Sequence, residues 1–196
     1  MLGRIYIIGE PILRKKTALV EKVGHEERQL FDQMLKLMRK AKGIGLAANQ
    51  AGLDKRMCVI CVEDKVWKLA NPEIIKKSGS EVFEEGCLSL PGITVNVKRA
   101  SGITCRALNE NNAQIEFEAL GLLARAIQHE IDHLLGKMII DYASPLEKLA
   151  LKEKIRELSA FIAVPINCHA RENGHPEILN PTRLDSRFRG NDTKRI

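Results

Sequence analysis

The chain has few aromatic residues and no long apolar run. Phe, Trp and Tyr make up 4% of its 196 residues, which leaves few rings on which single-stranded nucleic acid could stack its bases. No apolar segment reaches the roughly 20 residues that span a bilayer. The first residues, MLGRIYIIGEP, hold too short an apolar stretch for a signal peptide. We therefore expect a cytoplasmic protein without a membrane segment, and no sequence-specific binding of nucleic acid.

The chain has only five cysteines, which is an odd number. Five cysteines in a chain without an export signal argue against a disulfide framework. Cys58 and Cys61 form C-V-I-C within a run rich in β-branched residues, which is typical of a buried strand. Residues three apart on a strand point to opposite faces, so we expect both cysteines to pack in the core rather than to share a metal.

The composition is that of a globular protein, with 44% hydrophobic and 29% charged residues. The net charge of +6 is scattered along the chain, which permits contact with nucleic acid or ribosomes without indicating it. Beyond Pro165 the sequence loses its periodicity. We expect one folded domain over residues 1–164 and a flexible tail over 165–196.

Hydrophobic periodicity predicts helices and short strands in alternation with turns. The helices are expected at about 26–41, 120–135 and 145–163, and the strands at 56–63, 73–77, 93–97, 102–108 and 114–119. Asn71-Pro72 indicates a turn before the second strand, and residues 81–92 are expected to contain a loop around Cys87. The pattern favours an α+β fold, with mixed or antiparallel sheets around a buried helix 120–135 and a C-terminal helix.

The helix 120–135 carries the motif Q-H-E-I-D-H-L-L-G. His129 and His133 are four residues apart, so both lie on one face of the helix and can bind one metal ion, with Glu130 beside it. Leu122 and Ala126 share the histidine stripe, whereas Arg125, Gln128 and Asp132 fall on another side and are expected to pair with one another. The alternative is a pair of ordinary core or surface histidines. Because a helix that is apolar almost all round is buried, and unpaired buried polar groups are costly, a metal is the better explanation.

A third ligand must come from elsewhere in the chain, since catalytic metal sites usually have three protein ligands and one open position. Cys87, flanked by glycine and by Ser-Leu-Pro-Gly, is the strongest candidate. The segment G-I-G-L-A-A-N-Q at 43–50 satisfies a dinucleotide fingerprint, but a helix precedes it and a strand follows it, which is the reverse of that motif. Its glycines instead allow the backbone to approach an extended ligand closely.

Three segments together resemble the motifs of the peptide deformylases: G-I-G-L-A-A-N-Q at 43–50, E-G-C-L-S at 85–89 and Q-H-E-I-D-H at 128–133. The resemblance covers about residues 1–160 and implies removal of the N-formyl group from nascent chains that begin with formylmethionine. It implies Cys87, His129 and His133 as ligands of one divalent metal ion and favours ferrous iron, with zinc or another divalent metal as the alternative. Glu130 would be the general base and then the general acid.

The resemblance also implies that the Gln50 side chain and the Leu88 backbone N–H stabilise the oxyanion. The Gly45 backbone and Arg99 would align the peptide, and a methionine pocket would be shaped by Ile44, Leu88, Leu122 and Ala126. The basic helix at 145–163 is expected to dock near the ribosomal exit tunnel. Two alternatives stay open: a metalloendopeptidase with another third ligand, and a non-catalytic metal-binding or ribosome-associated module.

Overall fold

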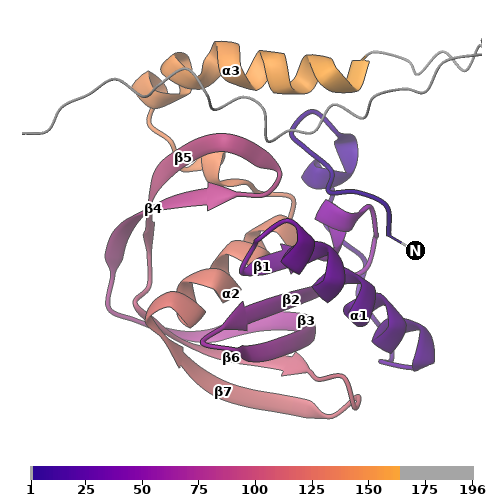
Figure 1. Ribbon diagram of the computed structural model, residues 1–196. Coiled ribbons are helices and arrows are strands. Elements are labelled where there is room, and N and C mark those ends of the chain that lie inside the picture. The colour runs from indigo at the N-terminus through magenta and orange to yellow at the C-terminus, as the bar shows by residue number, and fades with distance from the viewer. Residues whose placement is uncertain (1, 164–196) are drawn as a thin grey trace, which may run out of the picture. The chain divides into compact units, whose positions relative to one another are not determined.

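A computed structural model describes residues 2–163 of the chain (Figure 1). The expected tail at 165–196 lies outside the described residues. The helices are η1 (Pro11–Arg14), α1 (His25–Lys40), η2 (Ala48–Ala51), α2 (Gly121–Leu134), η3 (Ile139–Asp141) and α3 (Pro145–Ala163). The strands are β1 (Gly45–Ala47), β2 (Met57–Val62), β3 (Lys65–Ser78), β4 (Glu81–Cys87), β5 (Leu90–Arg99), β6 (Gly102–Leu108) and β7 (Gln114–Leu120). Within residues 2–163, no helix is both long and apolar enough to cross a membrane.

The strands form two sheets, and every strand pair in the described part of the chain is antiparallel. One sheet has five strands in the order β1-β2-β3-β6-β7, and the other is the hairpin β4-β5. Figure 1 shows α2 between the two sheets, with α3 beyond the hairpin. The predicted α+β fold around a central helix is confirmed, and its sheets are antiparallel.

The larger core cluster includes one side of α2. Ala124, Ile127 and Leu134 of α2 are buried in one cluster with residues of β1, β2 and α1. The amphipathic face of α1 closes that cluster with Phe31, Met34 and Met38, which are at helical spacing and fully buried. Cys58 and Cys61 lie on β2 as free cysteines, as expected for core positions. This packing fixes α2 as a rigid support for the polar side chains it carries.

Two local predictions were wrong. Asn71-Pro72 is not a turn between strands but part of the long strand β3, because the irregularity is absorbed as a β-bulge in its pairing with β6. Asn71 adopts a positive φ of 51°, and its side chain both donates to and accepts from the backbone of Val20. The segment before Cys87 is not a loop either, since it pairs with β5 as strand β4 and Cys87 is its last residue.

Candidate functional site

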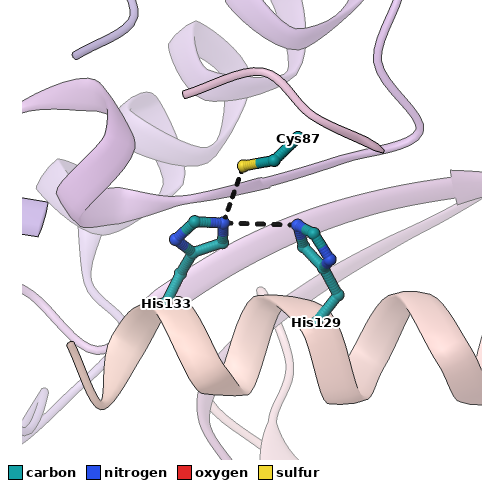
Figure 2. Close-up of side chains that lie close together, drawn as sticks. All are labelled: Cys87, His129 and His133. Carbon is teal, nitrogen blue, oxygen red and sulfur yellow. Dashed lines mark hydrogen bonds between the residues drawn. The ribbon is translucent and has the colours of Figure 1, made fainter. Parts of the chain in front are cut away.

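Three side chains converge where the end of β4 meets α2. The ligand atoms of Cys87, His129 and His133 lie within 4.8 Å of one another. The Cys87 Sγ is 3.1 Å from His133 Nε2, and that nitrogen is 3.2 Å from His129 Nε2. Figure 2 shows the two rings rising from one face of the helix toward the sulfur. The i, i+4 spacing thus aims both histidines at one point, as predicted, and strand β4 delivers the cysteine to it.

This donor set fits a divalent metal ion. His129 Nδ1 lies 3.0 Å from Glu85 Oε2, so Nδ1 donates its proton to the carboxylate and Nε2 is left with the lone pair that faces His133. Two imidazole nitrogens and a sulfur then point at a common centre. A tetrahedral ion with bonds of about 2.0–2.3 Å separates its ligands by about 3.5 Å, close to the spacings here. Sulfur and imidazole together suit zinc or ferrous iron.

The two histidines have opposite electrostatic environments. Burial disfavours a charged His129, but hydrogen bonds with Cys87 and Glu85 outweigh burial and raise the pKa of His129 to about 10. Burial, reinforced by the charge of His129, lowers the pKa of His133 well below its usual value. A charged His129 carries its second ring proton on Nε2, the nitrogen that faces the cluster, so a cation bound there would take the place of that proton and leave the imidazole neutral.

Glu85 is the buried carboxylate that supports His129. Its two oxygens accept from Arg99 Nε at 2.6 Å and Arg99 Nη2 at 3.0 Å, and Arg125 Nη1 lies 2.6 Å away. Burial opposes the charged carboxylate, but the hydrogen bonds from His129 and Arg99 outweigh it and lower the pKa of Glu85 to about 2. Glu85 thus stays ionised at neutral pH and fixes the orientation of the His129 ring.

Replacing Glu85 with glutamine should destabilise the fold in a pH-dependent way. The lowering of its pKa from 4.5 to about 2 corresponds to about 3 kcal/mol of folding free energy at neutral pH. A depressed carboxylate contributes this stability above its unfolded pKa and loses it as the pH falls toward 2. Urea unfolding with a chelator present should show a wild-type advantage at pH 7 that shrinks at pH 3. An equal advantage at both pH values would contradict the assignment, and Glu84→Gln is the exposed control.

Glu130 lies beside the three ligands and is 3% exposed. Burial raises the pKa of its carboxyl to about 7, against the opposing pull of His129 and Arg99. Its Oε2 has no hydrogen-bond partner among the described residues. A carboxylate held this way, with one oxygen uncommitted, can take a proton from a neighbouring water molecule.

Gly45 explains how the backbone of β1 can run against Glu130. A Cβ built at this position would stand 2.1 Å from Glu130 Oε1. Gly45→Ala should therefore displace either the strand or the carboxylate, and we expect the formate release that the resemblance implies to fall by about 10²-fold. Gly86→Ala is the control, because its nearest contact would be 3.9 Å away. Full activity in Gly45→Ala would show that the close approach is not needed.

The side chain of Gln50 is held in place beside Cys87. Its Oε1 accepts from the backbone N–H of Ala47 at 2.9 Å, so the amide orientation is set. Its Nε2 donates to Ser89 Oγ at 3.1 Å and lies 3.6 Å from Cys87 Sγ. Leu88, the residue after Cys87, packs so closely on Gly43 that a Cβ there would be 2.6 Å from its Cδ1. These contacts place two candidate donors, Gln50 Nε2 and the Leu88 backbone, next to the cysteine.

A cavity of about 520 Å³ opens at this cluster. The predicted pocket residues Ile44, Gly45, Leu88, Leu122 and Ala126 all line it. They share it with Gln50, Cys87, His129 and Glu130. Ile44 and Leu122 are 47% and 54% exposed, so their side chains form an apolar rim. The cavity is therefore apolar toward one end and polar at the cluster, as suits a small side chain attached to a reacting group.

Arg99 is placed differently from the prediction. It is 6% exposed and does not line the cavity. Its guanidinium is engaged by Glu85 on one side and by Asp132 Oδ2, 2.7 Å away, on the other. The predicted contact with the peptide is therefore wrong, because two buried carboxylates occupy the group; Arg99 positions Glu85 instead.

The expected mutual pairing of Arg125, Gln128 and Asp132 is also wrong. Arg125 donates a hydrogen bond to Glu85, and Gln128 forms hydrogen bonds with the backbone of Ala100 and Ala124. Asp132 accepts hydrogen bonds from Arg99 and Tyr142. Each partner lies on a different segment, so tertiary packing overrode pairing along the helix. Glu85 and Arg125 were both missed as site residues. Glu85 had a signal, since it lies two residues before Cys87 and so shares its face of a strand.

Comparisons with known proteins agree on one family. The family model described as polypeptide deformylase matches residues 2–149. The peptide deformylase of Thermodesulfovibrio yellowstonii is 41% identical over 75% of this chain and 92% of its own length. That of Dictyoglomus thermophilum is 44% identical over 79% of this chain and 100% of its own length. The crystal structure of a peptide deformylase from Legionella pneumophila is 36% identical, with a TM-score of 0.77, over 83% of this chain and 98% of that one.

Proposed function

The chain belongs to the polypeptide deformylase family, and from that premise we propose which of its residues carry out the reaction. The protein is a metal-dependent hydrolase that removes the N-formyl group from the formylmethionine of nascent polypeptides and releases formate. The observation that carries the assignment of roles is the convergence of Cys87, His129 and His133 beside Glu130 at the end of an apolar cavity.

Cys87, His129 and His133 hold the metal ion, which we propose to be ferrous iron. When bound, such an ion supplies Lewis acidity toward water and toward the formyl oxygen. Glu85 keeps the His129 lone pair aimed at the ion, because its own charge is secured by two arginines. With Cys87, His129 and His133 as its protein ligands, a bound ion would keep one position for water or substrate.

Glu130 acts as general base and then as general acid. Its free carboxylate oxygen takes the proton from the attacking water and keeps it until the amine leaves, so that a free N-terminus results. Gln50 Nε2 and the Leu88 N–H donate to the oxygen that becomes negative as the formyl carbon turns tetrahedral. Donors of this kind are worth about 3–4 kcal/mol each.

Gln50→Ala tests the oxyanion role. Loss of one donor should lower kcat for a formyl-methionyl peptide by about 10²–10³-fold, with a much smaller change in KM, because the bond forms mainly in the transition state. Ser89→Ala, which removes the other partner of the same amide, is the matched control. An effect confined to KM would assign Gln50 to substrate binding instead.

The peptide binds extended between two open strand edges. In the described residues β1 pairs with β2 alone and β4 with β5 alone, and both free edges border the cavity. A strand added between them would gain main-chain hydrogen bonds, with the Gly45 backbone closest to the reacting group. Ile44, Leu88, Leu122 and Ala126 then surround the methionine side chain.

We propose that helix α3 contacts the ribosome. The protein would then act in the cytoplasm, where it meets nascent chains. The helix carries four basic residues, Lys148, Lys152, Lys154 and Arg156. Its apolar residues Leu151 and Ile155 pack against a core cluster that includes the buried apolar residues of β5. Cosedimentation with ribosomes that weakens with salt would support docking. The same cosedimentation after charge reversal at Lys148 and Lys152 would contradict it.

A metalloendopeptidase is the alternative that uses the same helix motif. Incubation of the full chain with a formyl-methionyl peptide and with its unformylated twin separates the two activities. The deformylase yields formate from the first and leaves the second intact, and chelation followed by return of ferrous iron should abolish and restore that yield. Cleavage within either peptide would favour the peptidase.

A further inference from the structure

Arg125 is one of several charged residues that line the cavity, together with Lys42, Glu84 and Glu85. It lines the cavity and its side chain is 13% exposed. On α2 it lies three residues after Leu122 and four before His129, so these side chains share one face of the helix with Ala126. Arg125 is the charged residue next to Leu122 and Ala126, which we propose to surround the methionine side chain, so its free hydrogen-bond donors bear on what that part of the cavity can bind.

The guanidinium of Arg125 is held rigidly. Its Nη1 donates to Glu85 Oε1 at 2.6 Å and to the Val97 carbonyl at 3.1 Å, and its Nη2 donates to the Glu81 carbonyl at 3.1 Å. The Phe83 ring lies under the group, 4.9 Å from ring centre to Cζ. Because Glu85 secures its charge, Arg125 can remain ionised beside an apolar surface.

Part of the donor capacity of Arg125 is left over. A guanidinium carries five N–H groups, and within the described residues the Nε–H and the second Nη2 proton have no acceptor. The Nε atom is not among the buried atoms without a partner, so it is reached from open space. Arg125 also lines the cavity, and we assign its free donor to that space.

We propose that Arg125 recognises the sulfur group of the substrate's first residue, donating to a thioether and more strongly to a sulfoxide oxygen. This inference rests on the proposed function of the same cavity. Arg125 lies four residues, about 6 Å along the helix, from His129. The sulfur of an extended methionine stands roughly 4 Å from its Cα. A substrate whose formyl group is at the metal cluster therefore extends its sulfur along the helix toward Arg125.

The chemistry separates three side chains of nearly equal shape. A thioether sulfur is a weak acceptor and polarisable, a sulfoxide oxygen is a strong acceptor, and the methylene of norleucine accepts nothing. A purely apolar pocket would treat methionine and norleucine alike and reject the sulfoxide. A pocket with a free guanidinium donor prefers methionine and also admits N-formylmethionine sulfoxide. The deformylase would then process nascent chains whose first residue has been oxidised.

The test compares three peptides that differ only in the first residue: formyl-Met, formyl-norleucine and formyl-Met sulfoxide. Formate release by the full-length, metal-loaded protein gives kcat/KM for each, and ratios between peptides do not depend on the active fraction. The wild type should prefer methionine over norleucine by roughly three- to tenfold. In Arg125→Leu that ratio should approach one, and the rate on the sulfoxide relative to methionine should fall by at least about tenfold.

Two further variants sharpen the comparison. Lys42→Leu removes an exposed positive charge from the cavity lining without touching the guanidinium, and should keep the wild-type ratios. Arg125→Gln keeps an N–H donor without charge and should give intermediate ratios, which also covers the case of a poorly folding Arg125→Leu. A wild-type ratio of one, ratios that persist in Arg125→Leu, or an equal loss in Lys42→Leu would overturn the proposal. No formate from any of the three peptides would contradict the proposed function instead.

Discussion

Replacement of Glu130 by glutamine should lower kcat/KM for a formyl-methionyl peptide by about 10²–10⁴-fold and leave the metal content unchanged. Glutamine has the same shape and fills the same buried place, so packing against Gly45 is kept. It has no basic oxygen, however, and is unable to take the proton of the attacking water or return it to the leaving amine. Formate release gives kcat/KM, and metal analysis of the same preparation gives the metal content.

Glu84→Gln is the matched control for this variant, because Glu84 is an exposed carboxylate that lines the same cavity. It should lose less than a fewfold in rate, since exposed charges are screened by water. A Glu130→Gln protein that retains a tenth or more of wild-type activity would reject Glu130 as the base.

Replacement of Cys87 by alanine should remove the metal and, with it, formate release. Changes to residues that merely support a ligand commonly cost 10–100-fold in metal affinity, and we expect loss of one of three ligands to cost more than about 10²-fold. Metal content after dialysis against a weak chelator is the measurement. Cys61→Ala, a free and partly buried cysteine on β2, is the control and should keep its metal.

A Cys87→Ala protein that retains one ion per chain would contradict the ligand assignment. It would point to a different third ligand, as the metalloendopeptidase alternative requires. Retained metal with lost activity would place Cys87 beside the reaction but outside the coordination of the ion. The two measurements together therefore distinguish a ligand from a neighbour.

Local patterns were sufficient for the three α-helices, for five of the seven strands at least in part, and for half of the site, but they missed β1 and β4. The i, i+4 spacing of His129 and His133 fixes their common face on any helix, and α2 presents it as expected. The predicted bounds of α1 and α3 also match, because their apolar residues recur at helical spacing. Asn71-Pro72 was misread because a local turn signal does not show that a neighbouring strand can absorb the irregularity as a bulge.

Contacts between distant segments were beyond such patterns. Cys87 meets His133 across 46 positions of the chain, and no spacing predicts that pair. Cys87 was the strongest candidate because of its glycine-flanked surroundings, and the resemblance of three motifs then implied it as a ligand. Arg99 was expected at the peptide through the resemblance alone. Its partners, Glu85 and Asp132, come from a strand and a helix whose packing no periodicity reveals. Arg125 was expected on a structural side of the helix for the same reason, although it lines the cavity.

Parallel assay of formate and metal on the anaerobically prepared wild-type protein tests the central claim most directly. With a formyl-methionyl peptide as substrate, the account predicts stoichiometric formate and a free methionyl N-terminus from protein that carries about one divalent ion per chain, as a site with a single ligand triad requires. Protein with a filled site that releases no formate would contradict it.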